Sequence, residues 1–166
     1  MIQIKNAAEL EKMRKACAIS AAALKAGGEA IEPGITTAEI DKIIYDFIVR
    51  HGARPNFLHL YGFPATACIS VNDTVIHGIP SRQQQIRPGD IVSIDTGCKI
   101  DGFNGDNACT YACGKIDLEA QRLLDVTKES LHRGIEMARG GNRVGDIGHA
   151  VQSYVEENGF SVVRSF

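Results

Sequence analysis

The chain has 166 residues, of which 44% are hydrophobic and 23% charged, a composition typical of one soluble globular domain that excludes intrinsic disorder. A formal net charge of −2 leaves no global positive field, which argues against nucleic acid as the main partner. No apolar run reaches the roughly 18 residues of a membrane span, and the first residues lack a signal-peptide stretch, so we expect a cytoplasmic protein without a membrane partner.

Two helices are expected at the start of the chain. Asn6 and Glu9 have the spacing of a capping box, and apolar residues then recur every three to four positions until about Gly28. Thr36 and Glu39 form a second capping box ahead of another amphipathic run. The pattern therefore predicts a long first helix and a shorter second one.

The middle of the chain, residues 54–111, has the pattern of a sheet. Short β-rich runs at residues 67–71 and 91–95 are separated by turn signals. Asp101-Gly102 predicts a tight hairpin, because a type I′ turn needs positive φ at both central positions.

Helical periodicity returns near Leu118 and is interrupted at Gly140-Gly141 before it ends at Asn158-Gly159. These breaks predict another helix pair. Residues 160–166 are β-rich, and we expect them to form a last strand.

The two helical regions resemble each other at a shift of 107 positions. Any two amphipathic helix pairs can be slid into partial agreement, but here glycines coincide at the helix boundaries, which favours an internal duplication. The shift superposes Leu24 on Leu131, Glu29 on Glu136, Gly34 on Gly141, Ile40 on Ile147, Ile48 on Val155 and Gly52 on Gly159.

Asp95 and Asp106 are the main candidates for chemistry. If the hairpin turn makes Ile100 face Phe103, then Gly97 faces Asp106, and Asp95 points to the same sheet face on the diagonal. A carboxylate in an apolar strand should be paired or bind a metal, because its desolvation is costly. Spacing alone leaves open whether the two carboxylates bind a metal or lie in water at a sheet edge.

The remaining histidines and cysteines give weaker signals. Gly78 and Pro80 predict a stiff loop that leaves His77 partly exposed, although a lone histidine is more often structural than catalytic. No Cys-x-x-Cys pair exists, so we expect reduced thiols. We expect no catalytic role for the other histidines, and we expect packed side chains for two cysteines: His51, His59, His132 and His149, with Cys109 and Cys113.

Three motifs together resemble the first half of a type I methionine aminopeptidase, and the similarity covers essentially the whole chain. Each motif is weak alone, but their order and spacing are specific. They are the runs Cys68-Ile69-Ser70-Val71-Asn72-Asp73 with His77-Gly78-Ile79-Pro80, Arg87-Pro88-Gly89-Asp90-Ile91-Val92-Ser93-Ile94-Asp95, and Asp101-Gly102-Phe103-Asn104-Gly105-Asp106.

The resemblance implies an α+β pita-bread fold with two divalent metal ions on the inner sheet face, Mn, Fe(II) or Co by the oxygen-rich ligands. Asp95 and Asp106 match metal-binding aspartates, and His77 matches a catalytic histidine that contacts the substrate. Phe63 and Cys68 match the apolar substrate pocket. The implied reaction is attack of metal-activated hydroxide on the peptide carbonyl, which removes the N-terminal methionine of nascent polypeptides. The ribosome is a candidate partner.

This sequence departs from the family pattern in several ways. Asn104 stands where the family usually has a histidine, and Leu60 stands where a pocket tyrosine is expected. The family continues beyond Phe166 into a Gly-His-Gly-Ile-Gly segment, and the histidine ligand, both glutamate ligands and a second substrate histidine belong to that part.

We therefore expect one incomplete aminopeptidase-like domain over residues 1–166, with a first repeat at about 7–113 and a truncated second repeat at about 114–166. The alternative is a non-catalytic pita-bread module or a pseudogene product. A half-sheet without its partner should leave Val71, Ile91 and Ile94 partly exposed, and the chain should then tend to oligomerise or aggregate.

Overall fold

The computed structural model describes residues 3–164, and the chain divides into two compact units. The first unit reaches Ile116 and the second begins at Asp117. No helix between residues 3 and 164 is long and apolar enough to cross a membrane.

Both expected helices of the first unit are present, as α1 (Ala7–Glu29) and α2 (Thr37–Arg50). Their capping boxes are formed as the sequence predicts. The Asn6 side chain accepts a hydrogen bond from Glu9 N at 2.9 Å, and Glu9 Oε2 accepts one from Asn6 N at 2.8 Å. Such reciprocal bonds satisfy N–H groups that a helix start otherwise leaves without partners.

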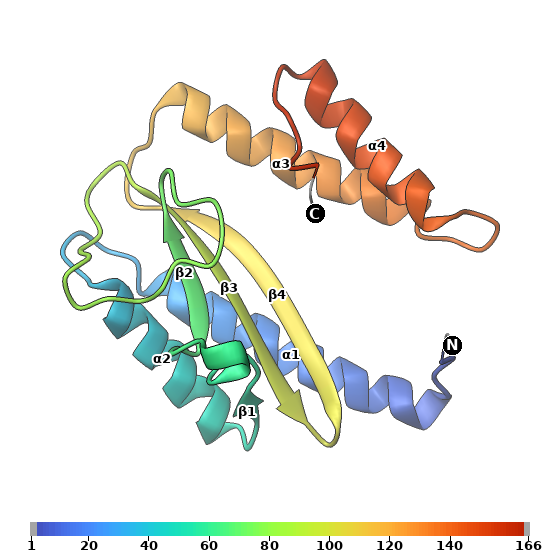
Figure 1. The fold of residues 1–166 in the computed structure, drawn as a ribbon, viewed down its shortest axis with the longest axis horizontal. Coiled ribbons are helices and arrows are strands. Elements are labelled where there is room, and N and C mark those ends of the chain that lie inside the picture. Colours follow the sequence, from blue (N-terminus) through green and yellow to red (C-terminus); the bar gives the residue numbers. More distant parts are fainter. Residues whose placement is uncertain (1–2, 165–166) are drawn as a thin grey trace. The chain divides into compact units, whose positions relative to one another are not determined.

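The sheet of this unit is antiparallel, with β3 (Ile91–Ile100) at its centre. The strand β4 (Phe103–Ala112) pairs with one edge of β3 along its whole length. The other edge of β3 pairs with β2 (Ala67–Val71) and with the two-residue β1 (Arg54–Pro55). Figure 1 shows α1 and α2 beside the strands of this sheet.

The hairpin between β3 and β4 has the expected turn and register. Asp101 and Gly102 both have positive φ, 52° and 85°. Ile100 pairs with Phe103, and further along the ladder Cys98 pairs with Gly105. The prediction from the Asp-Gly signal is confirmed.

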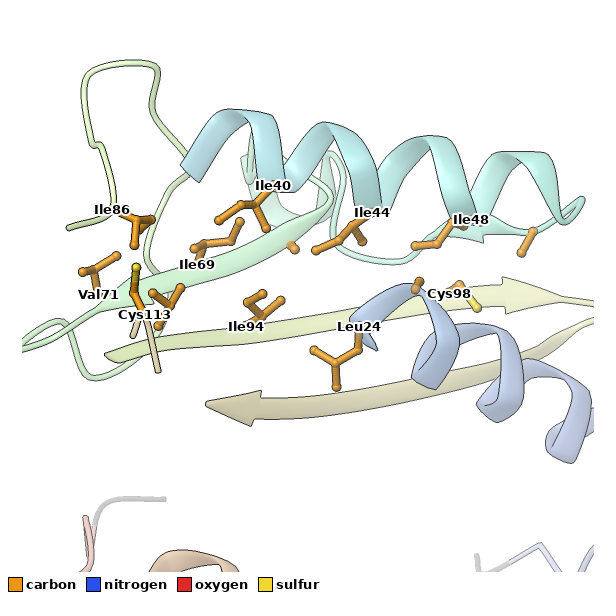
Figure 2. Close-up of a cluster of buried hydrophobic side chains, with 14 residues drawn as sticks. Leu24, Ile40, Ile44, Ile48, Ile69, Val71, Ile86, Ile94, Cys98 and Cys113 are labelled. Carbon is orange, nitrogen blue, oxygen red and sulfur yellow. The ribbon is translucent and has the colours of Figure 1, made fainter. Parts of the chain in front are cut away.

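The core lies between the helices and one face of the sheet. Figure 2 shows Ile40, Ile44 and Ile48 projecting from α2 toward Ile69 and Ile94 of the strands, and all five are at most 1% exposed. Each fully buried aliphatic side chain contributes about 1.5–3 kcal/mol of hydrophobic stabilisation.

We expected Val71, Ile91 and Ile94 of this sheet to be partly exposed, and this expectation is wrong for two of these three residues. Val71 and Ile94 are buried, and only Ile91 is partly exposed. The reason is that α1 and α2 cover the apolar face of the sheet without help from another unit. The first unit therefore has a hydrophobic core of its own.

The second unit is a helix pair, α3 (Leu118–Met137) and α4 (Val144–Glu157), as the periodicity predicts. The last expected strand is wrong for residues 160–164, which form no strand, while 165–166 lie outside the described residues. Phe160 N donates to Val155 O at 3.1 Å and its ring lies 5.1 Å from the Arg122 guanidinium. Between residues 117 and 164 there is no strand with which this segment could pair.

Candidate metal and substrate site

Asp95 and Asp106 lie on one face of the β3–β4 hairpin, opposite to the face that α1 and α2 cover. Asp106 pairs with Gly97, and Asp95 is two residues further along β3, so both side chains point to the same side. Both line a pocket of about 560 Å³ in the first unit. The structure thus brings together the two carboxylates that the register argument had placed on one face.

Burial and the neighbouring Asp106 both disfavour ionisation of Asp95. Asp95 is half-buried, and its pKa is raised to about 6 first by this burial, then by the charge of Asp106 and by a hydrogen bond with it. The charge of His77 acts in the opposite direction and lowers the pKa of Asp95. A paired, partly desolvated set of carboxylates is stabilised either by a proton or by a cation.

Residues 56–66 form the apolar wall of the pocket. The backbone of this segment turns sharply, because His59, Tyr61 and Gly62 all have positive φ around the short helix η1 (Leu60–Gly62). Positive φ is unusual for the two bulky residues and is often found at functional sites. The turn directs several apolar residues to the pocket: Phe57, Leu60, Phe63 and Pro64.

Cys68 completes this wall from β2, directly across from Asp95 in the ladder. Burial raises the pKa of the Cys68 thiol to about 11, and the charges of Asp95 and Asp106 add to this effect. The thiol is therefore neutral at ordinary pH and behaves as a small apolar group, since only the thiolate is a strong metal ligand.

His77 lies at the same pocket, in the loop that follows β2. It is exposed, and its φ is 58°. The next residue, Gly78, donates a hydrogen bond to Ser70 Oγ at 3.1 Å and accepts one from Ile69 N at 2.9 Å. A Cβ at Gly78 would overlap the Ile69 carbonyl, so only glycine allows this approach, which fixes the backbone next to His77.

Sequence reasoning missed several residues of this pocket: Phe57, Tyr61, Pro64 and Ile79. Ile79 lies within the first of the three motifs and Pro64 lies shortly before the same motif, so proximity to a motif could have indicated that these two residues line the pocket. Nothing local indicated Phe57 or Tyr61. Leu60, which replaces the tyrosine expected by resemblance, does line the pocket.

The other histidines and cysteines have different environments. His51 ends α2, where its Nδ1 lies 2.8 Å from Phe47 O and its ring stacks on Phe47. Cys113 is buried as expected, but the expectation for Cys109 is wrong, since its side chain is exposed. Cys109 lies on β4, an edge strand of the described sheet, and its side chain is not covered by an element packed on the sheet.

The residues from 3 to 164 contain no group of three or more His, Cys, Asp or Glu side chains placed to hold one metal ion. The candidate metal ligands in this part of the chain are therefore the two aspartates alone. Hard divalent cations usually need more oxygen or nitrogen donors than two carboxylates supply.

Comparison with known proteins agrees with the features of this site. Residues 11–166 match the model of metallopeptidase family M24. The chain is 51% identical over all its residues to a methionine aminopeptidase of Clostridium perfringens, and 44% identical to methionine aminopeptidase 1 of Bacillus subtilis. It spans 66% of the length of each of these relatives.

Among solved structures, the methionine aminopeptidase of Rickettsia prowazekii superposes with a TM-score of 0.95 at 38% identity. The match covers 98% of this chain and 65% of that one. The expected α+β pita-bread fold is confirmed by this likeness.

Proposed function

The chain belongs to metallopeptidase family M24, and from this premise we propose that it acts in the metal-dependent removal of N-terminal methionine from nascent proteins. One observation carries the proposal. A pocket with a neutral apolar wall also holds a close pair of carboxylates, so one pocket offers a site for an apolar side chain and a site for cations.

Asp95 and Asp106 are the proposed metal ligands. Their donor chemistry fits a hard divalent ion, and burial together with the charge of Asp106 raises the pKa of Asp95, a cost that a bound cation would offset. By analogy with the family, we propose that two divalent ions bind, and that each is Mn, Fe(II) or Co. Such ions would supply Lewis-acid polarisation of a carbonyl and activation of water. Two carboxylates are too few, so we propose that further donors come from sequence outside these 166 residues.

Phe63 and Cys68 are the proposed contacts of the methionine side chain, with Leu60 at the same wall. An unbranched thioether fits an apolar, partly open pocket of this kind, and a sulfur atom packs favourably against aromatic rings. The neutral Cys68 thiol leaves this wall uncharged, as suits an apolar side chain.

His77 is the proposed catalytic histidine. Its imidazole is exposed at the pocket, where it can donate or accept a hydrogen bond at the substrate's peptide group. The contacts of Gly78 with Ile69 and Ser70 fix the backbone next to His77, and the exposed imidazole is free to contact a substrate.

Nascent polypeptides are the proposed substrates, which would place the protein in the cytoplasm near the ribosome. Exposed apolar residues on α3, such as Leu131 and Ile135, support the proposal that the 166-residue polypeptide associates with itself.

The test compares the 166-residue polypeptide with a chimera that adds the remaining third of the Clostridium perfringens relative. We expect the polypeptide to release no appreciable methionine from a Met-Gly-Met peptide and to bind Mn²⁺ or Co²⁺ with a Kd of about 0.1 mM or weaker by calorimetry. The chimera should release methionine, and Asp95→Ala or Asp106→Ala should lower its rate at least about 100-fold.

Asp73→Ala is the matched control, because Asp73 is an exposed carboxylate of the loop after β2 that does not line the pocket. A folded chimera that binds methionine peptides without cleaving them would instead indicate a non-catalytic binding module. Cleavage that survives both aspartate substitutions would contradict the proposed metal ligands.

A further inference from the structure

The pocket wall formed by residues 56–66 has little core packing to hold its shape. Residues 56–64 are all at least partly exposed, and only the end of the segment is buried. Its conformation therefore depends on how its two ends are attached. At the first end, Asn56 N donates to Gly97 O of β3 at 2.9 Å.

At the second end, the segment enters β2, which pairs with β3 from Ala67 onward, and one side-chain atom of α2 adds a further attachment. Asp41 Oδ1 accepts hydrogen bonds from Thr66 N at 2.9 Å and from Ala67 N at 2.8 Å. Thr66 and Ala67 are at most 1% exposed, so without this acceptor their N–H groups would be buried without a partner. The side chain of Asp41 thus ties the start of β2 to α2.

Asp41 itself is half-buried and lies outside the pocket. Among the described residues no lysine, arginine or histidine forms an ion pair with it. Burial raises the pKa of Asp41, while the two backbone hydrogen bonds lower it. These two N–H groups are the compensation for a carboxylate that burial otherwise disfavours.

We propose that Asp41 is a positioning residue for the pocket that receives the substrate side chain. By fixing Thr66 and Ala67 it holds Phe63 on one side of this anchor and Cys68 on the other. Cys68 then faces Asp95 in the ladder, so the apolar wall and the carboxylate pair keep one relative position. The anchor stands on geometry alone, whereas the nature of the substrate rests on the proposed function.

The other helix pair argues that the carboxylate is not needed to form the helices. The shift of 107 positions places Gly148 of α4 at the position of Asp41, and a Cβ there would meet no atom within 4 Å. Even so, α4 has 14 residues, as α2 does. Asp41 is therefore explained by its contacts with the start of β2 rather than by helix formation.

The experiment uses the 166-residue chain and three variants: Asp41→Ala, Asp41→Asn and, as control, Asp46→Ala. Asp46 lies on the same helix, where its carboxylate pairs with Lys42 at the surface. The asparagine keeps an Oδ1 acceptor at the same place but removes the charge. The first measurement is the rate at which a thiol reagent labels Cys68, read by peptide mass spectrometry apart from the exposed Cys17 and Cys109.

The second measurement is the rate of hydrogen exchange at the amides of Thr66 and Ala67. The NMR chemical shifts of the same two amide protons are recorded alongside it. Asp41→Ala should speed Cys68 labelling and exchange at both amides at least about tenfold, because the wall opens locally. Asp41→Asn should stay within about twofold of the parent, since the acceptor is retained, and Asp46→Ala should not differ. A folded Asp41→Ala chain that labels at the parent rate overturns the proposal.

A folded Asp41→Asn chain that labels faster than the parent and loses the amide shifts also overturns it. If Asp41→Ala does not fold, the comparison of Asp41→Asn with the parent chain tests the proposal by itself. Adding L-methionine tests the proposed substrate separately from the anchoring role of Asp41. If methionine fails to protect Cys68 in the parent chain while Asp41→Ala still exposes it, the proposed substrate is wrong and the anchor stands.

Discussion

The two helix pairs of this chain share a local design and differ in what they pack against. Gly34 before α2 and Gly141 before α4 have the same φ of 96°. In the first pair a Cβ on Gly27 would lie 2.7 Å from Ile44 Cδ1, and in the second a Cβ on Gly134 would lie 2.8 Å from Val151 Cγ2. These positions coincide at the shift of 107 residues, so the geometry supports the predicted duplication, which stays a prediction.

Burial separates the two pairs. Leu24 on α1 is 7% exposed, whereas Leu131, its counterpart on α3, is 58% exposed. The helix α2 buries four residues, while α4 buries Val155 alone. Caps, glycines and periodicity are local signals and suffice to form a helix pair, but only a sheet provides the surface that buries the apolar face.

The largest expected effect comes from truncating the matched leucines. Leu24→Ala removes a core side chain beside the sheet and should cost about 2–5 kcal/mol of unfolding free energy. Leu131→Ala removes an exposed side chain and should cost under about 0.5 kcal/mol. Urea unfolding followed by circular dichroism measures both. Equal costs would mean that in solution the face of α3 is as buried as that of α1.

A second test concerns the contact of α1 with the sheet. Gly105 of β4 lies so close to α1 that a Cβ would overlap the carbonyl of Ala16. Because helix backbone cannot give way as a flexible side chain can, Gly105→Ala should cost about 3 kcal/mol. The melting temperature should fall accordingly. As a control, Gly102→Ser changes a turn glycine with open space around it, where only the positive φ opposes a side chain.

Several features of the fold could be predicted because their signals are local. The capping boxes, the glycine helix ends and the Asp-Gly turn each act within a few residues, and the turn register placed Asp95 and Asp106 on one face. That register says nothing of what the carboxylates bind, and their roles were inferred by resemblance.

Other features depend on contacts between distant parts of the chain. The pocket wall needs positive φ at His59 and Tyr61, which no glycine marks, and its anchor on Asp41 spans 25 residues. The failed strand at residues 160–164 and the exposed Cys109 share one cause. A β-rich run is not a strand without a neighbouring strand, and a strand side chain is not buried without a neighbouring element.

Burial of Asp95 beside Asp106 makes the stability of the first unit depend on pH. Since the pKa of Asp95 is raised to about 6, against about 3.9 when unfolded, the native state binds this proton more tightly. Its stabilising contribution is complete below about pH 4 and is lost as the pH rises through 6. Because Asp95 is half-exposed, solvent screening limits the effect to about 1 kcal/mol.

The measurement is urea unfolding at pH 5 and pH 7 in the presence of a chelator. The parent chain should gain stability toward pH 5 relative to Asp95→Asn, and this difference removes the contributions of other groups. A difference of the opposite sign would mean that a positive charge outweighs burial and the charge of Asp106 in setting the pKa of Asp95.

The smallest expected effect is a gain of stability in the second unit. Gly148 lies within α4 and is exposed, and a Cβ at this position would have no atom within 4 Å, so alanine meets no steric obstacle there. Alanine also restricts the unfolded chain and has the higher helix propensity, so Gly148→Ala should stabilise α4 by about 0.5–1 kcal/mol. Gly134→Ala is the matched comparison, because its methyl group would press on Val151 and cancel that gain. Hydrogen exchange of α4 amides detects both changes. If Gly148→Ala instead destabilises α4, another part of the folded protein must approach this glycine closely, as α1 approaches Gly105, and the contrast between the two helix pairs would then be smaller than their burial indicates.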